Sequence, residues 1–156
     1  MLKIVRNSGE LDVSRLKNVY DETIIAQKLE YSEFIEGLYD FLRINDVAIF
    51  IRQLENEYVC ALRLESYRQG YLISWLETRK DFRNAGHAKA LLRDVLSWCC
   101  ENGKVPVYTH VLKSNLRSLN VFTGCDFEIT GKPAVLLDGS VSSAYHTLIY
   151  KKEPTA

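Results

Sequence analysis

The stretch Arg83-Asn84-Ala85-Gly86-His87-Ala88 decides how this sequence folds around it. It stands between an apolar run, Tyr71–Leu76, that predicts a strand and a periodic run, Ala88–Cys100, that predicts a helix. A turn of small residues from a strand into a helix leaves the first N–H groups of the helix aimed outward, at the positive end of the helix dipole. The stretch therefore predicts a cradle for a pyrophosphate or a similar anion.

Three residues support this interpretation of the turn. Gly86 lets the backbone come close to a ligand, because it carries no Cβ atom. Arg83 and Lys80 add positive charge on the strand side of the turn. We therefore expect an anionic ligand to be held here by local groups.

Nothing in the overall composition attracts an anion or a membrane. The 156 residues are 47% hydrophobic and 26% charged, and 20 basic residues balance 20 acidic ones, so we expect one domain over residues 1–156 that binds neither nucleic acid nor membrane. The N-terminus alternates like a strand and lacks the apolar segment of a secretory signal, so we expect a cytoplasmic protein. The four cysteines show no CxxC spacing, and three of them lie in apolar or helical contexts that predict buried free thiols. One member of the Cys99-Cys100 pair is expected to pack in the core and the other to be partly exposed, and no metal site is indicated.

The hydrophobic periodicity divides the rest of the chain into alternating elements. It predicts a strand, two helices, three strands, a helix, a strand, a helix and two strands, which give a mixed, mostly antiparallel sheet of about seven strands with helices on both faces. Ser32 is the expected N-cap of the second helix, and residues 131–143 are expected to form a loop or a wide hairpin connection. The expected strands are 2–6, 47–53, 58–67, 71–78, 105–112, 127–130 and 144–152, and the expected helices are 11–24, 32–42, 88–100 and 115–124.

With these elements in place, the turn resembles a known signature. The pattern Arg-x-x-Gly-x-Ala after a strand is similar to the acyl-coenzyme A signature of the GCN5-related N-acetyltransferases (GNAT), and the order of elements matches the fold of that family along nearly the whole chain. A later family signature is matched by Asn115, Ser118 and Phe127. Phe122 stands where many members have a tyrosine that protonates the leaving thiolate, and Asp126 stands where a glycine is usual.

The resemblance implies which residues bind the donor, acetyl-CoA. The central parallel strands would splay apart and admit its pantetheine arm, and backbone groups near Leu76 and Thr78 would hydrogen-bond to the arm while a backbone N–H near Leu76 stabilises the oxyanion. The pyrophosphate would lie on Arg83, Asn84, Ala85, Gly86, His87 and Ala88, with Asn115, Ser118 and Phe122 as further donor contacts.

Two residues are candidates for the base that the resemblance implies. His110 occupies the place where the ribosomal-protein alanine acetyltransferases of this family carry a glutamate, and histidine accepts protons near neutral pH. Ser74 interrupts an apolar strand where some members place a base that acts through water. The alternatives are that His110 is a half-exposed strand residue without a role and that Ser74 is purely structural. Glu77 lies on the opposite face of that strand from Ser74, and we expect it to form a salt bridge.

The function implied by the resemblance is transfer of an acetyl group from acetyl-CoA to a primary amine of a small molecule, amino acid, peptide or protein. The acceptor pocket would be walled by residues 25–39 and 131–143, whose acidic and aromatic side chains suit a cationic amine, although acidic residues on helices also form ordinary solvated faces. A coenzyme A binding module without catalysis and an unrelated mixed-sheet domain are the alternatives. The resemblance also makes a homodimer possible.

Overall fold

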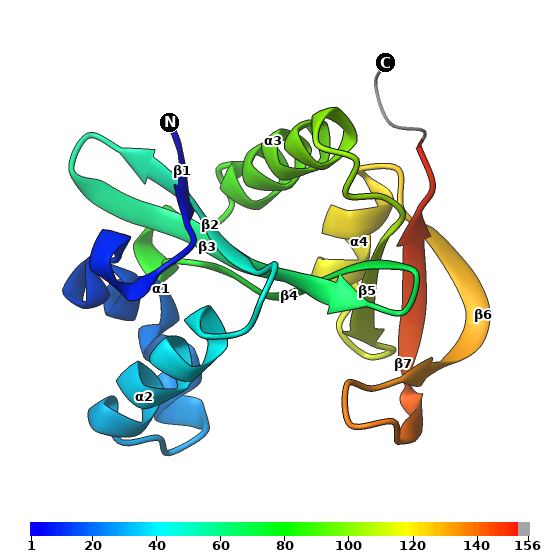
Figure 1. Cartoon of the computed structure of the whole chain (residues 1–156), viewed down its shortest axis with the longest axis horizontal. Helices are drawn as coiled ribbons and strands as arrows, with labels where there is room; N and C mark the ends of the chain where they lie inside the picture. The colour runs from blue at the N-terminus through cyan, green and yellow to red at the C-terminus, as the bar shows by residue number, and fades with distance from the viewer. Residues whose placement is uncertain (153–156) are drawn as a thin grey trace. The chain divides into compact units, whose positions relative to one another are not determined.

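The computed structural model describes residues 1–152, and these form one seven-stranded mixed sheet and four α-helices in the predicted order. The strand order is β1-β2-β3-β4-β5-β7-β6. This confirms the expected fold class. The strands are β1 (Leu2–Val5), β2 (Ala48–Leu54), β3 (Glu57–Tyr67), β4 (Gly70–Thr78), β5 (Val107–Leu112), β6 (Glu128–Val135) and β7 (Val141–Tyr150), and the helices are α1 (Val13–Ala26), α2 (Tyr31–Leu42), α3 (His87–Glu101) and α4 (Leu116–Thr123) (Figure 1).

The chain divides into two compact units. Unit 1 comprises Met1–Leu64 and Trp75–Leu91, and unit 2 comprises Glu65–Ser74 together with the chain from Leu92 onward. The elements β3, β4 and α3 each begin in one unit and end in the other. The expectation of a single domain over residues 1–156 stays a prediction.

The core of unit 1 lies between its strands and the helices α1 and α2. The two helices bury apolar side chains at helical spacing, including Leu16, Tyr20, Phe34 and Leu38, against β1, β2 and the first part of β3. Asp12 caps α1 by accepting a hydrogen bond from the Arg15 N–H at 3.1 Å.

The expected N-cap of α2 is wrong by two residues. The helix begins at Tyr31, and Glu30 rather than Ser32 is its N-cap. The Glu30 carboxylate accepts from the backbone N–H of Glu33, and the Glu33 carboxylate accepts from the Glu30 N–H at 3.0 Å. This reciprocal capping box satisfies the backbone N–H groups of Glu30 and Glu33. An N-cap at Ser32 would leave these two groups to water.

Strand β5 is at the centre of unit 2. It pairs in parallel with β4 over three residues on each strand, Tyr71–Ile73 and Val107–Thr109, and in antiparallel fashion with β7 along its whole length. Figure 1 shows β7 between β5 and β6. The short parallel ladder agrees with the splayed central strands that the family fold implies.

Gly70 holds the start of the parallel ladder. A Cβ atom at this position would lie 2.2 Å from the carbonyl oxygen of Pro106, so only glycine fits. The adjacent Tyr71 N–H donates to the same carbonyl oxygen at 3.0 Å. This close approach sets the register of β4 and β5.

The segment 131–143 is mostly strand rather than loop. Strand β6 continues to Val135 and β7 begins at Val141, so only residues 136–140 form the turn. The Asp138-Gly139 pair lies in this turn, with Gly139 at a φ of 87°, whereas Pro133 marks a register irregularity in β6, where a residue without an N–H group is tolerated. The connection is thus a hairpin with a shorter turn than expected, because Pro133 fits a bulge as well as a turn.

All four cysteines are buried free thiols, where burial was expected for three. The expected partial exposure of one member of the Cys99-Cys100 pair is wrong, because both are buried. Burial raises the pKa of the Cys60 thiol to about 11. Across residues 1–152, no helix is both long enough and apolar enough to cross a membrane.

Candidate active site

The loop before α3 lies in unit 1 and has the backbone of an anion cradle. Asn84 and Gly86 both have positive φ angles, 63° and 82°, which turn the chain sharply into the helix. The first backbone hydrogen bond of α3 runs from the Ala90 N–H to the Gly86 carbonyl oxygen at 3.1 Å. The N–H groups of His87 and Ala88 therefore precede the helical ladder and lie at the positive end of the helix dipole.

The cationic side chains of this loop are already paired with carboxylates. The Arg83 guanidinium contacts Glu22 at 2.6 Å and Glu77 at 2.8 Å, and its Nε donates to the Thr78 carbonyl oxygen at 3.1 Å. The Lys80 ammonium lies 3.7 Å from Glu22 as well. The salt bridge expected for Glu77 is confirmed. Arg83 thus ties the loop to β4 and α1, and its predicted contact with a pyrophosphate stays a prediction.

His87, the first residue of α3, is held by a neighbour on β2. The Arg52 Nε donates to the His87 Nδ1 at 3.1 Å, and the Phe82 ring lies edge-on to the imidazole. Partial burial, and then the charge of Arg52, lower the pKa of His87. A neutral imidazole at this position adds no positive charge to the cradle. Any attraction of the cradle for an anion would then come from backbone N–H groups.

Strand β4 breaks its extended conformation at Trp75, which has a φ of 57°. A bulky residue in the left-handed region inside a strand is strained, and such residues gather at functional sites. The break is held in place by Tyr20, a buried residue of α1 whose hydroxyl donates to the Trp75 carbonyl oxygen at 2.6 Å. The guanidinium of Arg63 lies 4.3 Å from the centre of the Trp75 ring.

The other β4 residues expected at the site flank this break. Leu76 and Thr78 lie in unit 1 and are half-buried, and the Thr78 hydroxyl is 3.3 Å from the Cys60 sulfur. Ser74 is the last residue of β4 in unit 2 and is half-buried. The proposed roles of these three residues stay predictions.

His110 lies on β5 in unit 2 and is hydrogen-bonded to Tyr67. The His110 Nε2 lies 3.2 Å from the Tyr67 hydroxyl oxygen, and that hydroxyl donates its single hydrogen to the Val135 carbonyl oxygen at 2.6 Å. The hydroxyl oxygen must therefore accept from His110, so Nε2 carries a proton. In the neutral ring, Nδ1 is then the atom with a free lone pair.

The surroundings of His110 favour its neutral form. Burial, and then the positive charge of Arg68, lower the pKa of the imidazole below its ordinary value of about 6.5. The Tyr67 ring packs edge-on against the imidazole, with 5.3 Å between ring centres. His110 is therefore a base that is available at neutral pH.

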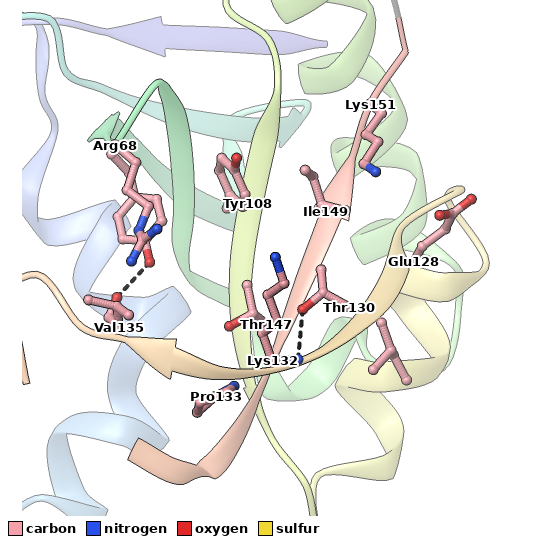
Figure 2. A pocket seen from close by; sticks show the side chains of 12 residues that line it. Arg68, Tyr108, Glu128, Thr130, Lys132, Pro133, Val135, Thr147, Ile149 and Lys151 are labelled. Atoms are coloured by element: carbon pink, nitrogen blue, oxygen red, sulfur yellow. Dashed lines mark hydrogen bonds between the residues drawn. The ribbon is translucent and has the colours of Figure 1, made fainter. Parts of the chain in front are cut away.

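A cavity of about 650 Å³ opens beside His110, entirely within unit 2. Tyr67 lines the cavity, and so does Thr147, which pairs with His110 across the β5–β7 ladder. Paired residues on one face of a sheet have neighbouring side chains. Figure 2 shows the lining side chains, which are Tyr67, Arg68, Tyr108, Glu128, Ile129, Thr130, Lys132, Pro133, Val135, Thr147, Ile149 and Lys151.

The second set of expected donor contacts lies on α4 in unit 2. Asn115 is the N-cap of this helix and accepts a hydrogen bond from the Ser118 N–H at 3.2 Å, so both residues define its first turn. Phe122 is only 3% exposed, and its ring packs against Phe127 with 5.1 Å between ring centres. Phe122 is thus a core residue of unit 2, and its contact with a donor stays a prediction.

Several acidic residues that were expected to face a cationic acceptor have structural partners. Glu30 and Glu33 form the capping box of α2. The Asp138 carboxylate accepts from the N–H and the hydroxyl of Ser140, which closes the β6–β7 turn and lowers the pKa of Asp138. Within residues 1–152, no group of three or more histidine, cysteine or acidic side chains is placed to hold a metal ion.

Four residues that shape these sites were not found from the sequence. Tyr20, Tyr67 and Trp75 belong to apolar patterns and were interpreted as core or strand residues, and Thr147 lies inside the last strand. The hydrogen bonds of Tyr20 and Tyr67 span 55 and 68 residues, so no local spacing reveals them. The signal that was present is a tyrosine at a buried position, since its hydroxyl requires a partner.

Comparison with known proteins agrees with this architecture. A family model described as the acetyltransferase (GNAT) family matches residues 14–127. No curated protein sequence matches the chain. At 12–16% identity, the similar solved structures establish the fold alone.

Three examples of these structures, each covering nearly the whole chain, are the following. The ribosomal-protein-alanine N-acetyltransferase of Brucella melitensis has a TM-score of 0.74 and 12% identity, over 97% of this chain and 99% of that one. An N-acetyltransferase of Staphylococcus aureus Mu50 has a TM-score of 0.71 and 16% identity, over 99% of both chains. The N-acetyltransferase PseH of Campylobacter jejuni, solved with acetyl coenzyme A, has a TM-score of 0.70 and 16% identity, over 98% of this chain and 100% of that one.

Proposed function

Because this chain belongs to the acetyltransferase (GNAT) family, we propose that it transfers an acetyl group from acetyl-CoA to a primary amine. The acceptor is a small molecule, an amino acid, or a peptide or protein. The observation that carries the proposal is His110, a half-buried imidazole of lowered pKa whose Nε2–H is held by Tyr67 beside a cavity of about 650 Å³.

The proposal assigns the donor contacts to three segments of the chain. They are the N–H groups at the start of α3, the backbone next to the break at Trp75, and Asn115 with Ser118 in the first turn of α4. A similar fold is known with acetyl-CoA bound, in the PseH protein of Campylobacter jejuni, which supports this choice of donor. Backbone donors suit a pyrophosphate here because Arg83 is already paired with two carboxylates.

In the proposed reaction, His110 removes the proton that blocks the attack. An alkyl amine has a pKa of about 10 and is mostly protonated at neutral pH, so its nitrogen has no free lone pair. The Nδ1 of His110 accepts that proton, the nitrogen attacks the thioester carbonyl carbon, and a backbone N–H near Leu76 stabilises the oxyanion. The C–S bond then breaks and the coenzyme A thiolate leaves. As the amide forms, the nitrogen gives up its second proton to solvent water, and water protonates the thiolate, because the phenyl ring of Phe122 has no proton to give.

One observation favours a second candidate function. Phe122 is buried against Phe127 where many family members carry a tyrosine acid, so a coenzyme A binding module without turnover is the alternative. A thiolate of pKa about 8.5 leaves without full protonation, so the missing acid is compatible with catalysis.

Release of free thiol from acetyl-CoA, measured across a set of amines, tests the proposal. We expect amine-dependent thiol release together with a rise in melting temperature when acetyl-CoA is added. Stabilisation by acetyl-CoA without thiol release for any amine would assign the binding module. No stabilisation at saturating acetyl-CoA would contradict both. A cytoplasmic location and a homodimer also remain predictions, to be checked by fractionation and light scattering.

A further inference from the structure

The cavity beside His110 contains a buried hydroxyl with no internal partner. Thr147 is 9% exposed, and its Oγ1 is buried without a hydrogen-bond partner among the described residues. Leaving a buried hydroxyl unsatisfied costs about 1 to 3 kcal/mol, so native structures rarely do so without a reason. Because Thr147 lines the cavity and pairs with His110, a bound ligand is the natural partner for this hydroxyl.

The charged groups of the cavity are mainly cationic. Arg68, Lys132 and Lys151 line it, and Glu128 is its one acidic lining residue. Neither the Lys132 nor the Lys151 ammonium forms an ion pair in the part of the chain that the structure describes. Figure 2 shows Lys132 on β6 and Lys151 on the segment that directly follows β7.

These cations lie at different distances from His110. Thr147 is opposite His110, and Lys151 follows it by four residues, which is about 13 Å along an extended chain. Arg68 follows Tyr67, which contacts His110 directly. The cavity can therefore accept a ligand with its reacting end near His110 and an anionic end beyond it.

This charge distribution selects among acceptors. A polyamine or another purely cationic acceptor meets three cations and one carboxylate in the cavity, which is unfavourable. An amine that also carries a carboxylate or a phosphate gains charge-assisted hydrogen bonds from the same groups. Nearby positive charge also lowers the pKa of the amine itself, which increases its reactive neutral form.

From these observations, and resting on the proposed function, we infer that the cavity binds an acceptor amine that bears an anionic group, with Thr147, Lys132 and Lys151 as its specificity residues. This reverses the expectation of a cationic acceptor that the acidic residues of α2 suggested. The shared chemistry of carboxylate and phosphate is what the site recognises.

Matched pairs of amines test the inference with the full-length protein and acetyl-CoA. We compare β-alanine with β-alanine amide, glucosamine 6-phosphate with glucosamine, and both pairs with spermidine. We expect the anionic member of at least one pair to have a kcat/KM at least tenfold above its neutral counterpart, and the pair that responds identifies carboxylate or phosphate. Equal values within both pairs, or spermidine as the best acceptor, would overturn the inference.

Two variants assign the preference to the cavity. The double variant Lys132→Gln with Lys151→Gln should reduce the ratio of kcat/KM for the anionic amine to kcat/KM for its neutral counterpart tenfold or more. Lys152→Gln is the matched control, because Lys152 is exposed and does not line the cavity. A preference that survives the double variant would contradict the inference.

A binding measurement separates this inference from the proposed function. If no amine is acetylated, the proposed function fails, and inorganic phosphate is then used as the probe in melting experiments. A phosphate-dependent rise in melting temperature that is lost in the double variant and kept in Lys152→Gln supports the anion site. An identical rise in all three proteins overturns it.

Discussion

The loop before α3 and the cavity beside His110 differ in whether their charged side chains already have partners. In the loop, Arg83 and Lys80 are both engaged by Glu22, so the structure is complete without a ligand. In the cavity, the Thr147 hydroxyl and the two lysine ammonium groups have no side-chain partner among the described residues. A ligand must displace existing ion pairs before it can bind to Arg83 and Lys80. In the cavity, a ligand can pair with the two lysines and the Thr147 hydroxyl without displacing another side chain. The chemistry that distinguishes this chain is therefore expected in unit 2.

The largest expected effect separates the two regions most directly. His110→Ala should lower kcat/KM a hundredfold or more, because general base catalysis contributes about 10² to 10⁴ in rate. A base acts in its deprotonated form, so the rate rises with pH through its pKa, and the lowered pKa of His110 places the midpoint of this limb below about pH 6.5. The pH profile of the variant should lack that limb.

The control for this variant is His146→Ala, which removes a histidine from β7 that pairs with Val111 rather than with His110. Its pH profile should match that of the unmodified protein. An acidic limb that persists in His110→Ala would remove His110 from the mechanism and return Ser74 to consideration.

The next effect tests the break in β4 within unit 1. Tyr20→Phe removes the hydrogen bond that the buried Tyr20 hydroxyl donates to the Trp75 carbonyl oxygen, so the free energy of unfolding should fall by about 0.5 to 1.5 kcal/mol. Denaturant melts measure it. Tyr31→Phe on α2 is the control and should change little, because the Tyr31 side chain is exposed. Equal stability of both variants would show that Tyr20 does not hold the break.

A smaller effect is expected where Tyr67 positions His110. Tyr67→Phe keeps the ring and removes the acceptor for the Nε2–H, so kcat/KM should fall about tenfold and the imidazole should lose its preferred tautomer. Nitrogen chemical shifts of His110 report the tautomer directly. A drop in activity with an unchanged tautomer would assign Tyr67 a structural role only.

The smallest effect concerns the paired charges of the loop. Glu22→Gln frees Arg83 and Lys80 from one carboxylate, and it should lower the KM for acetyl-CoA about two- to threefold at low salt, with the difference fading at high salt. Asp21→Asn is the matched control on the same helix, because Asp21 pairs with Lys17. A KM that is identical in the two variants would indicate that Arg83 has no share in donor binding.

Local patterns were sufficient to predict the elements and their order. The periodicity of α1 and the cradle at Gly86 depend on neighbours in sequence, so the residues themselves contain the signal. Pro133 misled the prediction because a proline fits a bulge as well as a turn.

The site required contacts that no local pattern contains. His110 was identified by its resemblance to a family position, but the nitrogen that carries its proton is set by two hydrogen bonds of Tyr67. The bond to His110 spans 43 residues, and the bond to Val135 spans 68. The pairing of Arg83 with Glu22 likewise joins residues 61 positions apart. Tertiary structure decides which of the predicted charges are available.

The two hydrogen bonds of Tyr67 have a consequence for the evolution of this protein. One hydroxyl group is bonded both to the imidazole and to the end of β6, so we expect a mutation at position 67 to alter turnover and protein abundance together. A growth-based selection scores these two losses as a single defect. Measuring the cellular protein level together with growth for every substitution at position 67 would separate them. The same measurement would show whether another contact can anchor the end of β6, so that residue 67 is free to change in evolution.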